Sequence, residues 1–270
     1  MLLSKIRNTW TFKKYHRSIK KFLAAKVYNN AKYLPEGIDR VYHIHIRKSA
    51  GTSINSAFWG LEGYNLKAVR REPIILGKRL SFVRYSKALI EKGDYFYASA
   101  HFARWQLNLK PNTFTFTMLR DPYERLTSLY KYYNWVDQID DETGYKLDPS
   151  YYVLKEQLHL LGNSFTDFMN NLSNKYLYNQ LYTFSEQLDV DEALRNIEKV
   201  DRVYFKDNFQ ASVEDLKNTL QLKELKFKNE RRFENVHFTI TEEEKTVAIN
   251  ALKKEREFYD KVKFKYFLKQ

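Results

Sequence analysis

The sequence of 270 residues contains no cysteine, only 8 glycines and only 5 prolines. The lack of cysteine excludes disulfide bonds and thiolate metal sites, and it fits a reducing compartment. No apolar stretch approaches the roughly 18 residues that a membrane-spanning helix needs. Met1-Leu2-Leu3 is followed by charged residues, so no secretory signal peptide is expected. These absences predict a cytoplasmic protein without a membrane-spanning segment.

The excess of positive charge lies mainly at the N-terminal end. The net charge is +13, and residues 1–40 carry +8 of it, because ten Lys and Arg residues stand there against Glu36 and Asp39. Apolar residues recur in this stretch at steps of three and four, which is typical of one side of a helix. They are Leu3, Ile6, Trp10, Phe12, Tyr15, Ile19, Phe22 and Leu23. We interpret residues 1–40 as a basic amphipathic arm. It can contact a membrane peripherally through residues 1–30, bind an acidic partner, or pack its apolar side on the rest of the chain.

Residues 41–270 are long enough to form one domain with a buried core. Strands are predicted at 41–46, 95–99, 113–119 and 202–206, and helices at about 52–59, 122–135, 152–172, 185–197, 209–220 and 241–262. Alternation of strands and helices with long connections predicts an α/β fold, in which a parallel β-sheet has helices on both faces. Residues 59–94 are expected to form an insertion with helical pieces. Residues 136–149 are expected to form an exposed acidic loop.

A basic turn of small residues joins the strand at 41–46 to the helix that follows. The turn and the first helical residues are Arg47, Lys48, Ser49, Ala50, Gly51, Thr52 and Ser53. The first N–H groups of a helix lack intrahelical partners and favour an anion, while the lysine adds charge and the hydroxyls add donors. The stretch therefore predicts a phosphate site, although an ordinary strand–loop–helix connection is the alternative. It is not a Walker A loop, because Lys48 precedes Gly51.

A second loop follows the strand at 113–119. Arg120 leaves this strand at the carboxyl edge of the sheet, Pro122 suits the first turn of a helix, and Ser128 lies about two turns further on. A guanidinium and a hydroxyl that converge at this edge can hold a phosphate from two sides. Arg125 belongs to the same helix, where it can pair with an acidic neighbour on the surface.

Histidines mark the ends of two predicted strands. His101 follows the strand at 95–99, at the edge of the sheet where catalytic groups of parallel α/β folds collect. Histidine titrates near neutrality and can accept a proton from a hydroxyl group, so His101 is a candidate base. A buried histidine that is satisfied by a backbone carbonyl is the alternative. His43 and His45 are two residues apart and so face the same side of their strand, where we expect packing and loop support. The carboxylates of 136–149 lack calcium-loop spacing, and no metal is expected.

The two loops together resemble PAPS-dependent carbohydrate sulfotransferases, above all the heparan sulfate 2-O-sulfotransferase-like group. The 5′-phosphosulfate loop of that family reads roughly His-Ile-Pro-Lys-Thr-Ala/Gly-Gly-Thr-Ser, and this chain has His45-Ile46-Arg47-Lys48-Ser49-Ala50-Gly51-Thr52-Ser53. Arginine replaces the proline, and serine replaces the first threonine. The eight-residue spacing from Arg120 to Ser128 matches the 3′-phosphate motif of the family. Ser99-Ala100-His101 is similar to the segment that supplies its general base.

Weaker likeness extends over about residues 40–265. Asn179-Gln180-Leu181 resembles a short Asn/Gln segment of the family, and Phe227-Lys228-Asn229-Glu230 resembles a late loop that closes over the nucleotide. The resemblance implies the following cofactor-binding set: Arg47, Lys48, Ser49, Ala50, Gly51, Thr52, Ser53, Arg120, Ser128 and Lys228. It also implies that Lys48, His101 and His45 serve catalysis.

The implied reaction is in-line transfer of a sulfuryl group from PAPS to a hydroxyl of a glycan, without a metal. Two other classes of function stay open on the sequence alone. A kinase-like phosphotransferase would use a similar phosphate site, although the chain lacks Walker A and an evident Mg²⁺ carboxylate after a strand. A non-enzymatic nucleic-acid-binding protein would use the basic arm and the tyrosines. Charge outside the arm is modest, however, and we expect no specific nucleic acid.

Overall fold

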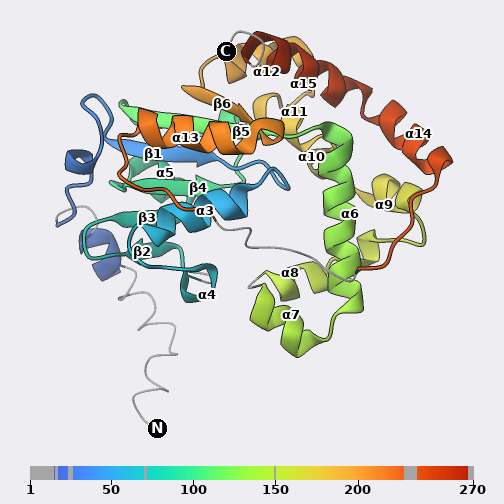
Figure 1. Cartoon of the computed structure of the whole chain (residues 1–270), viewed down its shortest axis with the longest axis horizontal. Helices are drawn as coiled ribbons and strands as arrows, with labels where there is room; N and C mark the ends of the chain where they lie inside the picture. Colours follow the sequence, from blue (N-terminus) through green and yellow to red (C-terminus); the bar gives the residue numbers. More distant parts are fainter. Residues whose placement is uncertain are drawn as a thin grey trace.

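The centre of the fold is a mixed β-sheet (Figure 1). The computed structural model describes residues 15, 18–23, 27–69, 72–148, 150–227 and 236–266. Within these ranges the sheet has six strands in the order β2-β3-β4-β1-β5-β6. They are β1 (Arg40–Ile44), β2 (Ile74–Leu76), β3 (Ser81–Arg84), β4 (Tyr97–Ala100), β5 (Thr113–Leu119) and β6 (Arg202–Phe205). All neighbours pair in parallel except β2 and β3. The predicted α/β fold with a largely parallel sheet is thereby confirmed.

Helices connect the strands and cover the sheet. The α-helices are α3 (Gly51–Gly60), α4 (Leu66–Val69), α5 (Lys87–Lys92), α6 (Pro122–Gln138), α7 (Asp141–Leu147), α8 (Tyr151–Lys155), α9 (Phe165–Asn171), α10 (Asn174–Leu177), α11 (Asn179–Phe184), α12 (Val190–Ile197), α13 (Phe209–Thr219), α14 (Glu242–Ala251) and α15 (Lys253–Tyr266). Short 3-10 turns are η1 (Ala31–Tyr33), η2 (Arg104–Gln106), η3 (Leu158–Leu160) and η4 (Lys206–Asn208). Every helix in the described ranges is too short or too polar to cross a bilayer.

The two faces of the sheet carry separate hydrophobic cores. On β1, Val41 packs with α3, α4 and α13, whereas Tyr42 and Ile44 pack with α5, α11, α12 and α15. This alternation follows from the two-residue period of a strand. Helices on both faces explain why the strands carry apolar residues on both sides.

Helix α6 lies beside the sheet, and α8, α9, α10 and α14 pack on it (Figure 1). Its apolar side, including Leu126 and Leu129, packs on α9, α10 and α14, and Trp135 packs on Tyr151 of α8. Asp121 caps its first turn by accepting a hydrogen bond from the N–H of Glu124 at 2.9 Å, and Pro122 occupies the first helical position. The long helix therefore forms a wall that faces the carboxyl edge of the sheet.

The structure corrects the sequence interpretation in several connections. The segment 59–94 contains β2 and β3, which extend the sheet, as well as helices. The segment 136–149 contains helix α7, and its Asp148 is buried beside the hydroxyl of Tyr132. The helices predicted at 152–172 and 241–262 are each divided into shorter pieces.

Only part of the arm lies within the described residues. Residues 18–23 are helical, and the apolar side chains of Tyr15, Ile19 and Phe22 are 67%, 56% and 62% exposed. Lys20 pairs with Glu72 of the domain at 2.9 Å. In these residues the arm therefore contacts the domain through a charged side chain, while its apolar side faces outward.

Candidate functional site

The turn from β1 into α3 has an unusual backbone. Lys48 and Ala50 both have positive φ, 66° and 60°, a region that residues with a Cβ rarely adopt. Such left-handed residues allow a turn to direct neighbouring N–H groups to one side, where they can bind an anion. Ala50 is also the N-cap of α3 and has no side-chain cap, so the first N–H groups of the helix are not capped by its side chain. The predicted phosphate loop thus has a backbone suited to an anion.

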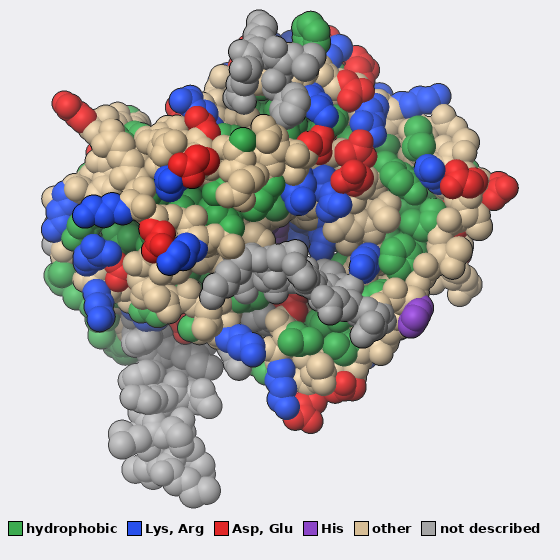
Figure 2. Space-filling model, viewed as in Figure 1, with side chains coloured by type: hydrophobic (Ala, Val, Ile, Leu, Met, Phe, Trp, Pro, Cys, Tyr) green, Lys and Arg blue, Asp and Glu red, His purple; other side chains and the backbone are tan. Residues whose placement is uncertain are grey.

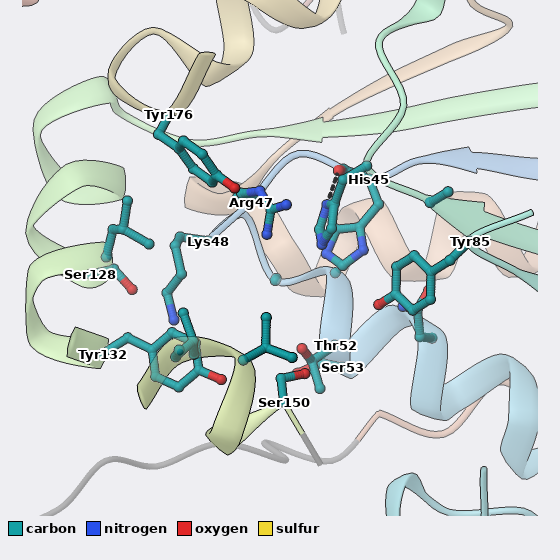
Figure 3. Close-up of a pocket in the computed structure, with 18 of the residues that line it drawn as sticks. His45, Arg47, Lys48, Thr52, Ser53, Tyr85, Ser128, Tyr132, Ser150 and Tyr176 are labelled. Atoms are coloured by element: carbon teal, nitrogen blue, oxygen red, sulfur yellow. Dashed lines mark hydrogen bonds between the residues drawn. The ribbon is translucent and has the colours of Figure 1, made fainter. Parts of the chain in front are cut away.

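Side chains of this loop line a cavity of about 990 Å³ (Figure 3). Arg47, Lys48, Thr52 and Ser53 all lie on its wall, together with the backbone region of Ala50 and Gly51. The ammonium of Lys48 lies over the ring of Tyr132, 4.3 Å from its centre. Ser49 differs from the other predicted residues, because its side chain is buried and does not line the cavity.

A column of rings leads from the core to the cavity. Neighbouring centroids are 4.7, 5.1 and 4.1 Å apart along the series Phe116, His43, His45 and His101. Burial lowers the pKa of His43 to about 3, so this imidazole is neutral at physiological pH. The His45 ring packs directly on the start of α3, where a Cβ added to Gly51 would lie 1.9 Å from His45 Nε2. Glycine at this position therefore permits the close approach of histidine and helix.

His101 lies on the cavity wall in a defined orientation. Its Nδ1 is 2.7 Å from the carbonyl oxygen of His45, and this is the hydrogen bond drawn in Figure 3. A carbonyl only accepts, so Nδ1 carries the proton and the lone pair of the neutral ring belongs to Nε2. The alternative that the sequence left open, a histidine satisfied by a backbone carbonyl, therefore describes this hydrogen bond correctly. The ring is nevertheless half-buried and placed where it can meet a ligand.

Arg120 and Ser128 line the opposite side of the same cavity. Arg120 follows β5, and its guanidinium donates to the carbonyl of Lys48 at 3.3 Å and pairs with Glu124 at 3.2 Å. Ser128 belongs to α6, and Figure 3 shows its side chain beside that of Lys48. The two predicted phosphate loops thus meet at one cavity, as their positions at the carboxyl ends of neighbouring strands require.

Two adjacent residues of α11 hold the two loops in place. Asn179 Oδ1 accepts the backbone N–H of Arg47 at 2.9 Å. Gln180 accepts the backbone N–H of Arg120 and donates to its carbonyl, both at 2.8 Å. In the sequence these residues stand out only through a weak resemblance to the family. Their polar side chains beside apolar neighbours were the one available signal of a structural role.

Arg125 has a different role from the one considered from the sequence. It is completely buried and pairs with Glu255 of α15 at 3.1 Å, rather than with an acidic neighbour on α6. Glu255 also accepts a hydrogen bond from Gln180 at 3.0 Å. A buried ion pair therefore supports the residue that positions Arg120.

The wall of the cavity is strongly basic. Seven Lys and Arg residues line it, and no Asp or Glu is among the described residues that do so. The seven are Arg47, Lys48, Arg84, Arg120, Lys131, Lys175 and Lys206. Figure 2 shows Lys and Arg side chains gathered around a hollow in this face of the molecule. Charge of one sign on a concave wall favours a polyanionic ligand.

Several lining residues had no local signal in the sequence. Tyr85 directly follows β3, Tyr132 belongs to α6 and Tyr176 to α10. The guanidinium of Arg47 lies over the ring of Tyr176, 5.0 Å from its centre. Lys228 lies outside the described residues. Across the described ranges, no group of three or more His, Asp or Glu side chains is placed to hold a metal ion.

Comparison with known proteins identifies the family of the chain. A family model described as the Sulfotransferase family matches residues 33–266, which include both loops, His101 and α11. No curated protein matched the sequence. The family match covers most of the chain and the whole cavity wall. The protein therefore belongs to the sulfotransferase family.

Proposed function

We propose that this protein transfers a sulfuryl group from PAPS to a hydroxyl group of a saccharide. The observation that carries the proposal is the convergence of two anion-binding loops and His101 on one basic cavity. The family membership supports sulfuryl transfer. The choice of PAPS and of a saccharide, as in the heparan sulfate 2-O-sulfotransferase-like group, rests on the loop resemblances and on the tyrosines of the wall.

In this proposal each loop holds one end of the donor. The N-terminus of α3, Lys48 and the hydroxyls of Thr52 and Ser53 hold the 5′-phosphosulfate, and Arg120 and Ser128 hold the 3′-phosphate. PAPS supplies the sulfuryl group and leaves as PAP. Arg47 and the backbone of Ser49 complete the first loop. These groups fit the donor because its charges are spread over two separate anionic ends and the wall offers cations for both.

The chain's own residues then serve the transfer. A bond forms between the acceptor hydroxyl oxygen and sulfur as the bond from sulfur to the 5′-phosphate oxygen breaks. His101 Nε2 accepts the hydroxyl proton, and His45 keeps the His101 ring oriented through its carbonyl. Lys48 and the N–H groups of α3 stabilise the charge that develops on the leaving phosphate. Cationic residues and N–H groups carry this charge compensation, with no metal assigned.

Calorimetric titration with PAP tests the donor assignment. We expect the wild-type protein to bind PAP without Mg²⁺ and Arg120→Ala to bind it about 10–100-fold more weakly, because one charge-assisted contact to a phosphate is lost. Arg202→Ala is the matched control, since Arg202 is an exposed arginine that does not line the cavity. Its affinity should equal that of the wild type.

Other results of this titration would redirect the assignment. Binding of ATP–Mg²⁺ in place of PAP would favour a phosphotransferase. If neither nucleotide bound, and a polyanion bound in a salt-sensitive way, the nucleic-acid-binding alternative would gain instead.

We also propose that the arm, residues 1–40, contacts anionic membranes peripherally through residues 1–30, beside a catalytic domain of residues 41–270. The exposed Ile19 and Phe22 and the neighbouring lysines support this contact. Co-sedimentation with vesicles containing phosphatidylserine should decrease at least several-fold in an Ile19→Glu/Phe22→Glu variant, with phosphatidylcholine vesicles as the control. Equal sedimentation of variant and wild type would contradict it. The cytoplasmic location stays a prediction.

A further inference from the structure

The strand order arranges the groups of the site in a row along one edge of the sheet. From β5 to β3 the carboxyl ends carry Arg120, the loop after β1, His101 after β4, and Arg84 with Tyr85 at the end of β3. All these strands are parallel, so their ends share the edge, about 4.8 Å apart from strand to strand. The donor groups thus occupy one side of His101. The end of β3 lies on the other side of His101, which leaves that side of the cavity for an acceptor.

Tyr85 is held at this place in a costly conformation. It has a φ of 49°, which is uncommon for a residue with a bulky side chain, and strain of this kind concentrates at functional sites. Its side chain is 50% exposed and lines the cavity, with its ring centre 6.0 Å from that of His101. Figure 3 shows Tyr85 beyond the histidines, on the side away from Ser128 and Tyr132.

The side chain of Arg84 packs against the ring of Tyr85. Arg84 is 7% exposed, and its guanidinium lies over two rings, 4.7 Å from the centre of the Trp59 ring and 5.0 Å from the centre of the Tyr85 ring. It also donates to the carbonyl of Val69 at 3.4 Å. Stacking between a cation and aromatic faces orients both partners. Tyr85 is therefore an open aromatic ring supported on one side, next to the candidate base.

We propose that Tyr85 is a binding residue for the acceptor, and that a sugar ring stacks against it with the reacting hydroxyl directed towards His101. The proposal rests on the proposed function and adds the subsite that selects the acceptor. The C–H groups on the face of a pyranose suit the negative face of an aromatic ring, whereas its hydroxyl edge remains available for hydrogen bonds. Arg84 acts as a positioning residue, because it sets the orientation of the tyrosine ring.

Saturation-transfer difference NMR on the PAP-loaded protein tests this subsite, with cellotetraose as an uncharged probe. We expect saturation of the sugar ring protons in the wild type and in Tyr85→Phe, which keeps the ring, and about a tenfold weaker affinity in Tyr85→Ala. Tyr145→Ala is the matched control, because Tyr145 is an exposed tyrosine of α7 that does not line the cavity. It should behave as the wild type.

Three outcomes would contradict the proposed subsite. No saturation of cellotetraose by the wild type, or equal saturation by Tyr85→Ala, would each exclude a sugar platform at Tyr85. Calorimetry with PAP on the same samples separates these results from failure of the proposed function, in which the wild-type protein would not bind PAP. Tyr85→Ala should bind PAP with wild-type affinity, since the donor groups lie on the other side of His101. Loss of PAP affinity in that variant would also contradict the division of the site.

Discussion

Replacement of Lys48 by alanine is expected to lower the rate of sulfuryl transfer by about 10²–10³-fold. The lysine lies between the N-terminus of α3 and the wall formed by α6, on the side of the cavity where the proposed donor would place its leaving phosphate oxygen. Charge on that oxygen is greater in the transition state than in the bound donor, so the lost interaction should appear in kcat more than in PAP affinity. Single-turnover transfer from radiolabelled PAPS to an acceptor oligosaccharide would measure it.

The control for this prediction is Lys146→Ala, which removes an exposed lysine of α7 outside the cavity. Its single-turnover rate should match that of the wild type. A Lys48→Ala rate within threefold of the wild type would show that another group carries the charge compensation. A loss of PAP affinity as large as the loss of rate would instead assign Lys48 to ground-state binding.

Glu255→Ala should reduce the free energy of unfolding by about 3–5 kcal/mol. The carboxylate is fully buried, pairs with Arg125 at 3.1 Å, and accepts a hydrogen bond from Gln180. Its removal leaves the buried guanidinium without its counter-charge, which costs far more than the loss of an exposed pair. Urea unfolding followed by circular dichroism would measure the change.

The same helix offers a matched comparison. Glu257 of α15 pairs with Lys261 at 2.6 Å, but both side chains are about half exposed. Glu257→Ala should therefore change the unfolding free energy by less than about 1 kcal/mol. Equal unfolding free energies of the two glutamate variants would contradict the larger contribution to stability that we expect from the buried pair.

The sequence was sufficient to locate the elements that build the site. The strand β5 lies where the alternation of apolar residues and hydroxyls predicts it, and α3 and α6 begin within a residue of their expected starts. Arg120 and Ser128 line the same cavity as Lys48, although 72 residues separate the first of them from the lysine. Such loops are predictable because their function depends on local backbone geometry and on residues close together in the chain.

The other features of the fold and of the site depend on contacts between residues that are far apart in the sequence. β2 and β3 are three and four residues long, and they are separated by a charged turn, so no sequence period identifies them as strands. Arg125 pairs with a glutamate 130 residues away, whereas its acidic sequence neighbours suggested a surface role. Tyr85 faces the cavity because a short strand ends beside β4, which only the sheet order reveals.

Asn179 and Gln180, side by side on one helix, each hold one of the two loops. The separation between the loops is therefore a property of the folded chain before any ligand arrives. A ligand with two anionic groups at that separation can bind both without the entropy loss of ordering either loop. A ligand with one such group leaves half of this preorganised arrangement unused. If the proposed donor is correct, helix α11 sets the distance between the groups that hold its two anionic ends, and it thereby favours nucleotides whose phosphates are that far apart.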